Sequence, residues 1–145
     1  MDHVDRPRRS LNMAAIRSEN TGPEIAVRKI VHRLGYRFRL HVRTLPGRPD
    51  LVFPVRRKVI FVHGCFWHRH PRCRYATSPK THEEFWRTKF ISNVARDRNA
   101  RRELKRMDWA VLTVWQCELK RTDKLTKRLD DFLSESDFIE TRKSK

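Results

Sequence analysis

The sequence has no apolar run that approaches the roughly 20 residues of a membrane-spanning helix. Its first ten residues also lack the apolar centre of a secretory signal peptide. Internal repeats and low-complexity linkers are absent as well. These absences exclude an integral membrane protein, and they predict a soluble protein of the cytoplasm.

Cysteine is also scarce, with 3 residues in the chain. An odd number cannot complete a disulfide framework, and such frameworks belong to secreted proteins rather than to chains without a secretion signal. Histidines lie close to the cysteines in the sequence. This composition favours reduced thiols or a metal site over disulfides.

Acidic residues are half as common as basic ones, with 17 Asp and Glu against 34 Lys and Arg. The formal charge of +17 exceeds what solubility requires and suits a polyanionic partner. Nucleic acid is the leading candidate, because the basic residues are spread along the chain and interleaved with Trp and Phe. A membrane surface is the rival partner, and a merely solvated basic face is a third interpretation.

The length suffices for one compact domain and is short for two. We predict a flexible basic arm over residues 1–10, a single domain over residues 11–138 and a polar tail over residues 139–145. We expect a monomer.

Two helices are predicted in the first part of the chain. Residues 11–16 form a short segment with one apolar side. Thr21 then has the position of an N-cap, with Pro23 in the first turn and Glu24 at the capping-box position. Gly35 would end this second helix.

Strands are predicted at four places. Residues 36–42 alternate between apolar and polar side chains, which is typical of a half-exposed strand. Two short apolar runs, residues 50–53 and 58–62, predict a central hairpin of mostly buried strands. Residues 109–115 form the fourth strand candidate.

A long basic helix is predicted from a second capping-box pattern, which begins at Thr81, to about Met107. A last amphipathic helix carries apolar residues from Leu125 to Leu133. The segment over residues 63–80 has little periodicity. The order of helix, three strands, long helix, strand and helix predicts an α/β fold with a central mixed sheet flanked by helices.

Three cysteines and a histidine form the first candidate site, and they provide the Cys3His ligand set of a closed tetrahedral zinc site. Such a site would pin the irregular loop to the sheet, because a loop of this length is otherwise costly to order. His68 is an alternative to the histidine of this set, and unliganded thiols are the simpler interpretation. The four residues are Cys65, His70, Cys73 and Cys117.

A hydrolytic site is predicted where the hairpin strands meet. Asp50 opens one strand and His63 ends the next, so their ends can lie side by side in an antiparallel pair. Magnesium prefers oxygen ligands and keeps several waters, so one carboxylate, a backbone carbonyl and DNA phosphate oxygens would suffice. His63 and His68 are candidates for proton transfer near neutral pH, with a structural role as the alternative.

Adjacent aromatic residues suggest how DNA would be contacted. Phe66 and Trp67 lie in the irregular loop, where no core periodicity accounts for them, and they could wedge between base steps. Packing against the core is the alternative. Lys89 and Asn93 extend the helix face of Trp86 and could hydrogen-bond to base edges. Phosphates or solvent would be met by Arg96, Arg98, Arg101 and Arg102.

Three motifs together resemble the very-short-patch-repair (Vsr) family of DNA mismatch endonucleases. Residues 48–50 are Arg-Pro-Asp, residues 63–68 are His-Gly-Cys-Phe-Trp-His, and residues 114–118 are Val-Trp-Gln-Cys-Glu. The similarity begins at Asn12 and covers most of the chain. The combination of these motifs is highly specific.

The resemblance implies a restriction-endonuclease-like fold and a strand-specific nick 5′ to the thymine of a T:G mismatch. Such mismatches arise when 5-methylcytosine deaminates, and their correction is very short patch repair. Trp86 would be a third wedging ring, and Met13 would enter from the other groove. The resemblance also implies a MutL-type repair protein as partner, a cytosine methyltransferase alongside, and action on the nucleoid of a prokaryote.

The family's functional residues can be transferred position by position. Asp50 would hold magnesium together with the main-chain carbonyl of Val62. His68 would be the general base, His63 would assist near the phosphate, and Glu24 would orient the site. The family's structural zinc would fall on Cys65, His70, Cys73 and Cys117.

Two alternatives remain open. A zinc-stabilised DNA-binding module without catalysis would keep the basic charge and the cysteines but would not need Asp50 or His68. A related nickase with a different lesion or sequence specificity would need all of them.

Overall fold

The computed structural model describes residues 21–135, so the predicted arm, the helix over residues 11–16, Met13 and the polar tail lie outside the described part. Within that part, no helix has the length and apolarity needed to cross a membrane. The elements follow the predicted order. They are α2 (Gly22–Arg33), β1 (Arg39–Leu40), β2 (Leu51–Phe53), β3 (Lys58–His63), α3 (Glu83–Arg106), β4 (Ala110–Trp115), the 3-10 helix η1 (Gln116–Lys120) and α4 (Thr122–Ser134).

The four strands form one mixed sheet in the order β1-β2-β3-β4. The pairs β1–β2 and β2–β3 are antiparallel, and β3 runs parallel to β4 from Lys58 opposite Ala110 to His63 opposite Trp115. The predicted hairpin and the mixed sheet are therefore confirmed. As a consequence, β3 and β4 end at the same edge of the sheet.

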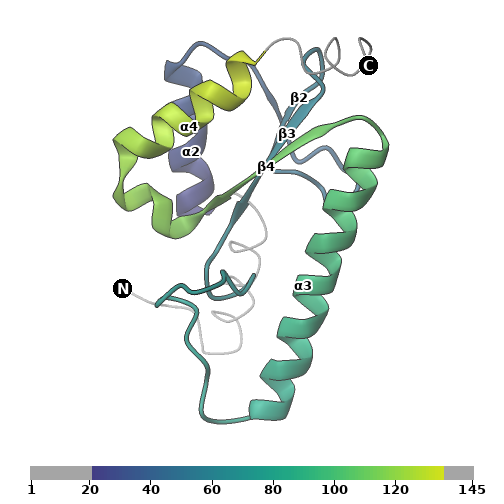
Figure 1. The fold of residues 1–145 in the computed structure, drawn as a ribbon, viewed down its shortest axis with the longest axis vertical. Helices are drawn as coiled ribbons and strands as arrows, with labels where there is room; N and C mark the ends of the chain where they lie inside the picture. The colour runs from purple at the N-terminus through teal and green to yellow at the C-terminus, as the bar shows by residue number, and fades with distance from the viewer. Residues whose placement is uncertain (1–20, 136–145) are drawn as a thin grey trace, which may run out of the picture.

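Helices cover both faces of the sheet (Figure 1), with α2 and α4 side by side on one face and the long α3 on the other. The core under α2 and α4 contains side chains such as Val27, Ile60 and Leu129, all fully buried. The core under α3 is smaller and includes Val59 and Leu104. Because α3 meets the sheet only near its C-terminal end, its N-terminal half extends beyond the sheet.

The start of α2 follows the predicted capping pattern. Thr21 is extended, and its hydroxyl accepts a hydrogen bond of 3.3 Å from the backbone N–H of Glu24. Gly35 has a φ of +96°, a left-handed conformation that ends the helix at little steric cost. This cap fixes Glu24 in the first turn, where its side chain is almost fully buried.

Two sequence predictions about element ends are wrong. The strand expected over residues 36–42 is only Arg39–Leu40, because His41 takes a left-handed φ of +48° and pairing with the short β2 ends there. The helix expected from Thr81 begins at Glu83. Its N-cap is His82, also left-handed and without a side-chain cap, so Thr81 lies one residue too early to cap the first turn.

Candidate active site and metal centre

A cleft of about 760 Å³ opens where β3 ends, between the start of α2, the loop after β3 and the middle of α3. It brings together residues that are far apart in the sequence. Among the predicted site residues, those that line it are Glu24, Asp50, Val62, His63, Phe66, Trp67, His68, Lys89 and Asn93.

Asp50 reaches the cleft because it directly precedes β2, whose partner β3 ends there. The backbone N–H of Val62 donates a 2.6 Å hydrogen bond to Asp50 Oδ2. The two strand ends thus lie side by side, as the hairpin predicted. Among the described residues, the imidazole that lies beside Asp50 is nevertheless that of His41, whose Nε2 lies 4.0 Å from Asp50 Oδ1, and His63 lies in a separate group.

Glu24, His41 and Asp50 form the first polar cluster, which we call the carboxylate cluster, and its two carboxylates line the cleft. His41 Nε2 lies 2.5 Å from Glu24 Oε2, and Arg28 contacts the same oxygen from the next turn of α2. Burial raises the pKa of Asp50 to about 7, and the nearby charge of Glu24 adds to the effect. Sequence analysis missed His41, because no motif contains it.

His63, His68 and Asp97 form the second polar cluster. His68 Nδ1 lies 2.7 Å from Asp97 Oδ2, and the two imidazole rings stack at 3.8 Å with 5° between their planes. Asp97 Oδ1 lies 4.0 Å from His63 Nε2, so one carboxylate faces both rings. Sequence analysis gave Asp97 no role.

The two histidines of this cluster differ in their surroundings. Burial lowers the pKa of His63 to about 3, and the neighbouring His68 contributes in the same direction. His63 is therefore a neutral imidazole at physiological pH. Its Nδ1 is buried and has no hydrogen-bond partner among the described residues.

An aromatic cluster lies beside these groups. The ring centroids of Phe66 and Trp67 are 5.1 Å apart, and Trp86 lies 5.7 Å and 5.6 Å from them. Phe90 completes the cluster at 5.3 Å from Phe66. All four side chains are half-buried, so each ring keeps part of its surface exposed. Stacking within the cluster and contact with a ligand are both possible for these rings.

Two polar residues hold the loop that carries the aromatic pair. Asn93 Nδ2 on α3 donates a 3.1 Å hydrogen bond to the carbonyl of Trp67. The guanidinium of Arg69 donates to the carbonyls of Ala76 and Thr77 and lies over the ring of Phe90, 4.1 Å from its centroid. The loop is thus fixed to α3 although it has no helix or strand of its own.

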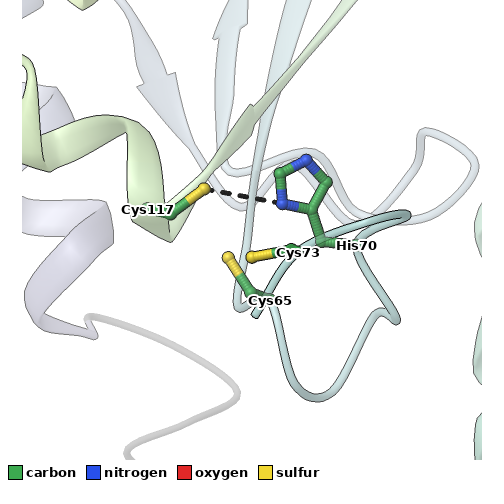
Figure 2. A group of neighbouring side chains, drawn as sticks. All are labelled: Cys65, His70, Cys73 and Cys117. Carbon is green, nitrogen blue, oxygen red and sulfur yellow. Dashed lines mark hydrogen bonds between the residues drawn. The ribbon is translucent and has the colours of Figure 1, made fainter. Parts of the chain in front are cut away.

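The four predicted zinc ligands converge (Figure 2). One ligand atom from each of them lies within 4.8 Å of every other, and Cys117 Sγ is 3.5 Å from His70 Nδ1. Cys65, His70 and Cys73 come from the loop after β3, and Cys117 comes from η1 after β4. His68 belongs to the other cluster. The two residues between His70 and Cys73 are accommodated without separating the ligands.

The surroundings of this cysteine cluster are ordered. The ring of Trp115 stacks on His70 at 4.2 Å with 10° between the planes. Glu118 accepts from the backbone N–H of Trp115 and from Arg128 on α4, which ties η1 to the body of the protein. Burial raises the pKa of Cys65 to about 12, so the free thiol stays protonated until a metal displaces the proton.

The donor atoms of the two candidate metal sites differ in kind. The cysteine cluster offers three sulfurs and one nitrogen, the soft set that suits a closed tetrahedral zinc site. The carboxylate cluster offers two carboxylates that line the cleft and one imidazole nitrogen beside them, a mixed set that can hold a divalent cation together with some of its waters. The residues present in both clusters can therefore hold a divalent metal ion.

Comparison with known proteins agrees with this architecture. Residues 1–75 match the family model described as DNA mismatch endonuclease Vsr. The chain is 48% identical over 135 residues to the type II nicking enzyme V.XorIIP of Xanthomonas oryzae pv. oryzae, covering 93% of this chain and 98% of that protein.

Two further relatives show the same breadth of similarity. The DNA mismatch endonuclease Vsr of Escherichia coli is 43% identical over 134 residues, covering 92% of this chain and 83% of that protein. The type II nicking enzyme V.NmeAIP of Neisseria meningitidis is 37% identical over 128 residues, covering 88% and 91%. With the motifs assembled in one cleft and matches that span most of both chains, this protein belongs to the Vsr family of DNA mismatch endonucleases.

Proposed function

We propose that this protein is a magnesium-dependent DNA endonuclease that nicks one strand 5′ to the thymine of a T:G mismatch. The observation that carries the proposal is the cleft itself, in which the carboxylates of Glu24 and Asp50, the Asp-supported His68 and the rings of Phe66 and Trp67 line one space. The charge of +17 supports duplex DNA as the substrate. Family membership supports the nicking reaction.

Asp50 and the main-chain carbonyl of Val62 would hold the magnesium ion, with Glu24 orienting the site from the start of α2. When bound, the ion would polarise the scissile phosphate and stabilise charge on its oxygens. Asp50 is held for this task by the Val62 N–H. The aspartate is half-buried rather than fully buried, so it remains open to the cleft.

His68 is suited to be the general base. If its Nδ1 carries the proton and donates to Asp97, the opposite nitrogen keeps a lone pair that can take a proton from water. Asp97 would fix this tautomer and stabilise the imidazolium that forms. His63, neutral and stacked on His68, would assist near the phosphate.

Zinc bound by Cys65, His70, Cys73 and Cys117 would have a structural role. The ligands close the loop after β3 onto η1, and His68 lies within that loop. Ordering a long loop by a metal offsets the conformational entropy that its immobilisation costs. Zinc would thus hold the general base in place.

The aromatic cluster would recognise the mismatch. A mispaired step resists unstacking less than a paired one, so rings that wedge between bases discriminate against intact DNA. Phe66, Trp67 and Trp86 would form the wedge, joined by Met13 from the other groove. Lys89 and Asn93 line the same cleft and would contact the base edges. In the cell we expect action on the nucleoid as a monomer, with a MutL-type protein as a further partner.

The test uses end-labelled duplexes that differ only in one T:G or T:A pair, incubated with and without magnesium. We expect a nick 5′ to the mismatched thymine, on that strand alone and only with magnesium. Equal cleavage of both duplexes would refute mismatch recognition, and binding without cleavage would favour a DNA-binding module. Trp86→Leu should lower the ratio of the cleavage rates on T:G and T:A duplexes about tenfold, because one stacking ring is lost.

A nickase with a different lesion or sequence specificity is the second candidate function. Several relatives are named type II nicking enzymes rather than mismatch endonucleases. This second candidate predicts that cleavage depends strongly on the sequence that flanks the thymine. Duplexes with one T:G pair in varied flanking sequences distinguish the two, since a general T:G nickase would cleave all of them at similar rates.

A further inference from the structure

His41 has no part in the activity proposed above, yet it lies against both carboxylates of the cleft. Its Nε2 is 2.5 Å from Glu24 Oε2 and 4.0 Å from Asp50 Oδ1. The ligand atoms of the three residues lie within 4.8 Å of one another, close enough to share one ion. Two oxygen donors and one nitrogen donor are therefore grouped at the site where the metal is expected.

The backbone at the end of β1 determines where this imidazole lies. His41 follows β1 directly, and its N–H lies 3.5 Å from the carbonyl of Asp50 across the strand pair. Its φ of +48° is left-handed, a conformation that histidine adopts more readily than most residues with a side chain.

The carboxylate cluster keeps negative charge that a cation can neutralise. Glu24 and Asp50 supply two carboxylates, and Arg28 on α2 contacts Glu24 and offsets one of them. His41 is the only group of the three ligands that contributes a nitrogen atom. A nitrogen donor favours first-row transition ions over magnesium, which prefers an all-oxygen environment.

We infer that His41 is a nitrogen ligand of the cleft metal, so that the site binds manganese(II), a transition ion that accepts both carboxylate and imidazole, more tightly than magnesium. The inference rests on the proposed function in that both use the same metal site. A hydrogen bond from His41 to Glu24 with no metal role is the competing explanation. The two differ in whether the imidazole nitrogen is bonded to the ion.

Manganese(II) itself is the probe. Zinc-loaded full-length protein, freed of other divalent ions, is titrated with manganese(II) by electron paramagnetic resonance, and magnesium is then added as competitor. Spin-echo modulation detects any ¹⁴N nucleus bonded to the manganese. We expect imidazole modulation in the wild type and an affinity for manganese at least about tenfold above that for magnesium.

His41→Asn removes the imidazole but tolerates the left-handed backbone. It should abolish the ¹⁴N modulation and weaken manganese binding about tenfold, with less than about a threefold change for magnesium. His41→Gln, which keeps the reach of the side chain, should give the same spectral result if the first variant folds poorly. His32→Asn alters an exposed histidine of α2 and should change neither quantity.

Two results would overturn the inference: no ¹⁴N modulation in the wild type, or modulation that persists in both His41 variants and so comes from His63 or His68. Failure of the proposed function is a separate outcome. A site with manganese–nitrogen bonding but no nicking of T:G duplex refutes only the proposed reaction. Magnesium-dependent nicking without such bonding refutes only the role of His41.

Discussion

The cysteine cluster and the carboxylate cluster lie near the same edge of the sheet but differ in the chemistry of their donor atoms. The first gathers three sulfurs and a nitrogen between the loop after β3 and η1. The second offers mainly oxygen atoms to a cleft of about 760 Å³. A closed soft site has no position for a substrate, whereas an open hard site does. Under the proposed function, the same sheet edge would support one structural and one reactive centre.

Their placement follows from the strand order. Cys65 and Cys117 each come two residues after a strand, β3 and β4, and these parallel strands end together. Asp50 precedes β2, which is antiparallel to β3 and therefore starts at the same edge. Predictions that separate the two clusters test this division of roles.

The largest effect is expected for Asp50→Asn. Loss of the carboxylate charge should lower the nicking rate on T:G duplex by about 10³-fold or more, equivalent to roughly 4 kcal/mol of transition-state stabilisation. Zinc content should stay unchanged. Single-turnover nicking and elemental analysis measure the two quantities, with Asp123→Asn on the exposed face of α4 as control. Undiminished nicking would exclude Asp50 as a metal ligand.

Cys117→Ser tests the other cluster. Bound zinc should fall from one per chain to near zero, and the melting temperature should drop by roughly 10 °C, because the metal no longer joins the loop to η1. His70→Ala should behave alike, and His32→Ala should keep its zinc. A protein that loses zinc but melts unchanged would contradict the structural role.

Asp97→Asn should have a smaller effect on activity than Asp50→Asn. The amide can no longer fix the proton on Nδ1 of His68, so we expect the nicking rate at saturating DNA to fall about 10²-fold. The affinity for T:G duplex, measured without added metal, should not change. Asp131→Asn, in an exposed ion pair of α4, is the control. A fall in affinity with an unchanged rate would assign Asp97 to DNA binding instead.

The smallest effect concerns stability without added divalent ions. Burial raises the pKa of Asp50 to about 7 in the folded protein, above its ordinary value of 3.8. The folded state therefore binds this proton more tightly, and stability is lost as pH rises through this range. Asp50→Asn does not titrate, so its melting temperature relative to the wild type should rise by several degrees from pH 5 to pH 8. A difference independent of pH would contradict the buried environment of Asp50.

Much of the site could be predicted because its residues carry strong local signals. Thr21 and Glu24 fit a capping pattern, the apolar runs of the hairpin define β2 and β3, and the three cysteines leave none unused. The structure confirms the cap, the hairpin and the grouping of Cys65 and Cys117 with the other two ligands. The cap and the hairpin depend on residues that are neighbours in sequence. The metal site could be predicted because three cysteines cannot all pair in disulfides.

His41 and Asp97 could not be predicted in the same way. His41 reaches Glu24 only because a left-handed turn ends β1 opposite Asp50, and the alternating pattern predicted a longer strand there. Asp97 lies among arginines of α3, where a carboxylate is expected to balance charge. Its contact with His68 depends on how α3 crosses the loop, which a single sequence does not define.

The cleft metal, rather than the structural zinc, is expected to supply the chemistry of the nick. The direct measurement is single-turnover nicking of one T:G duplex by protein that has been exchanged into magnesium-free buffer and still contains one zinc per chain. We predict no nicking until magnesium is added, with the zinc content constant throughout. Nicking at full rate by this zinc-loaded protein without magnesium would contradict the account.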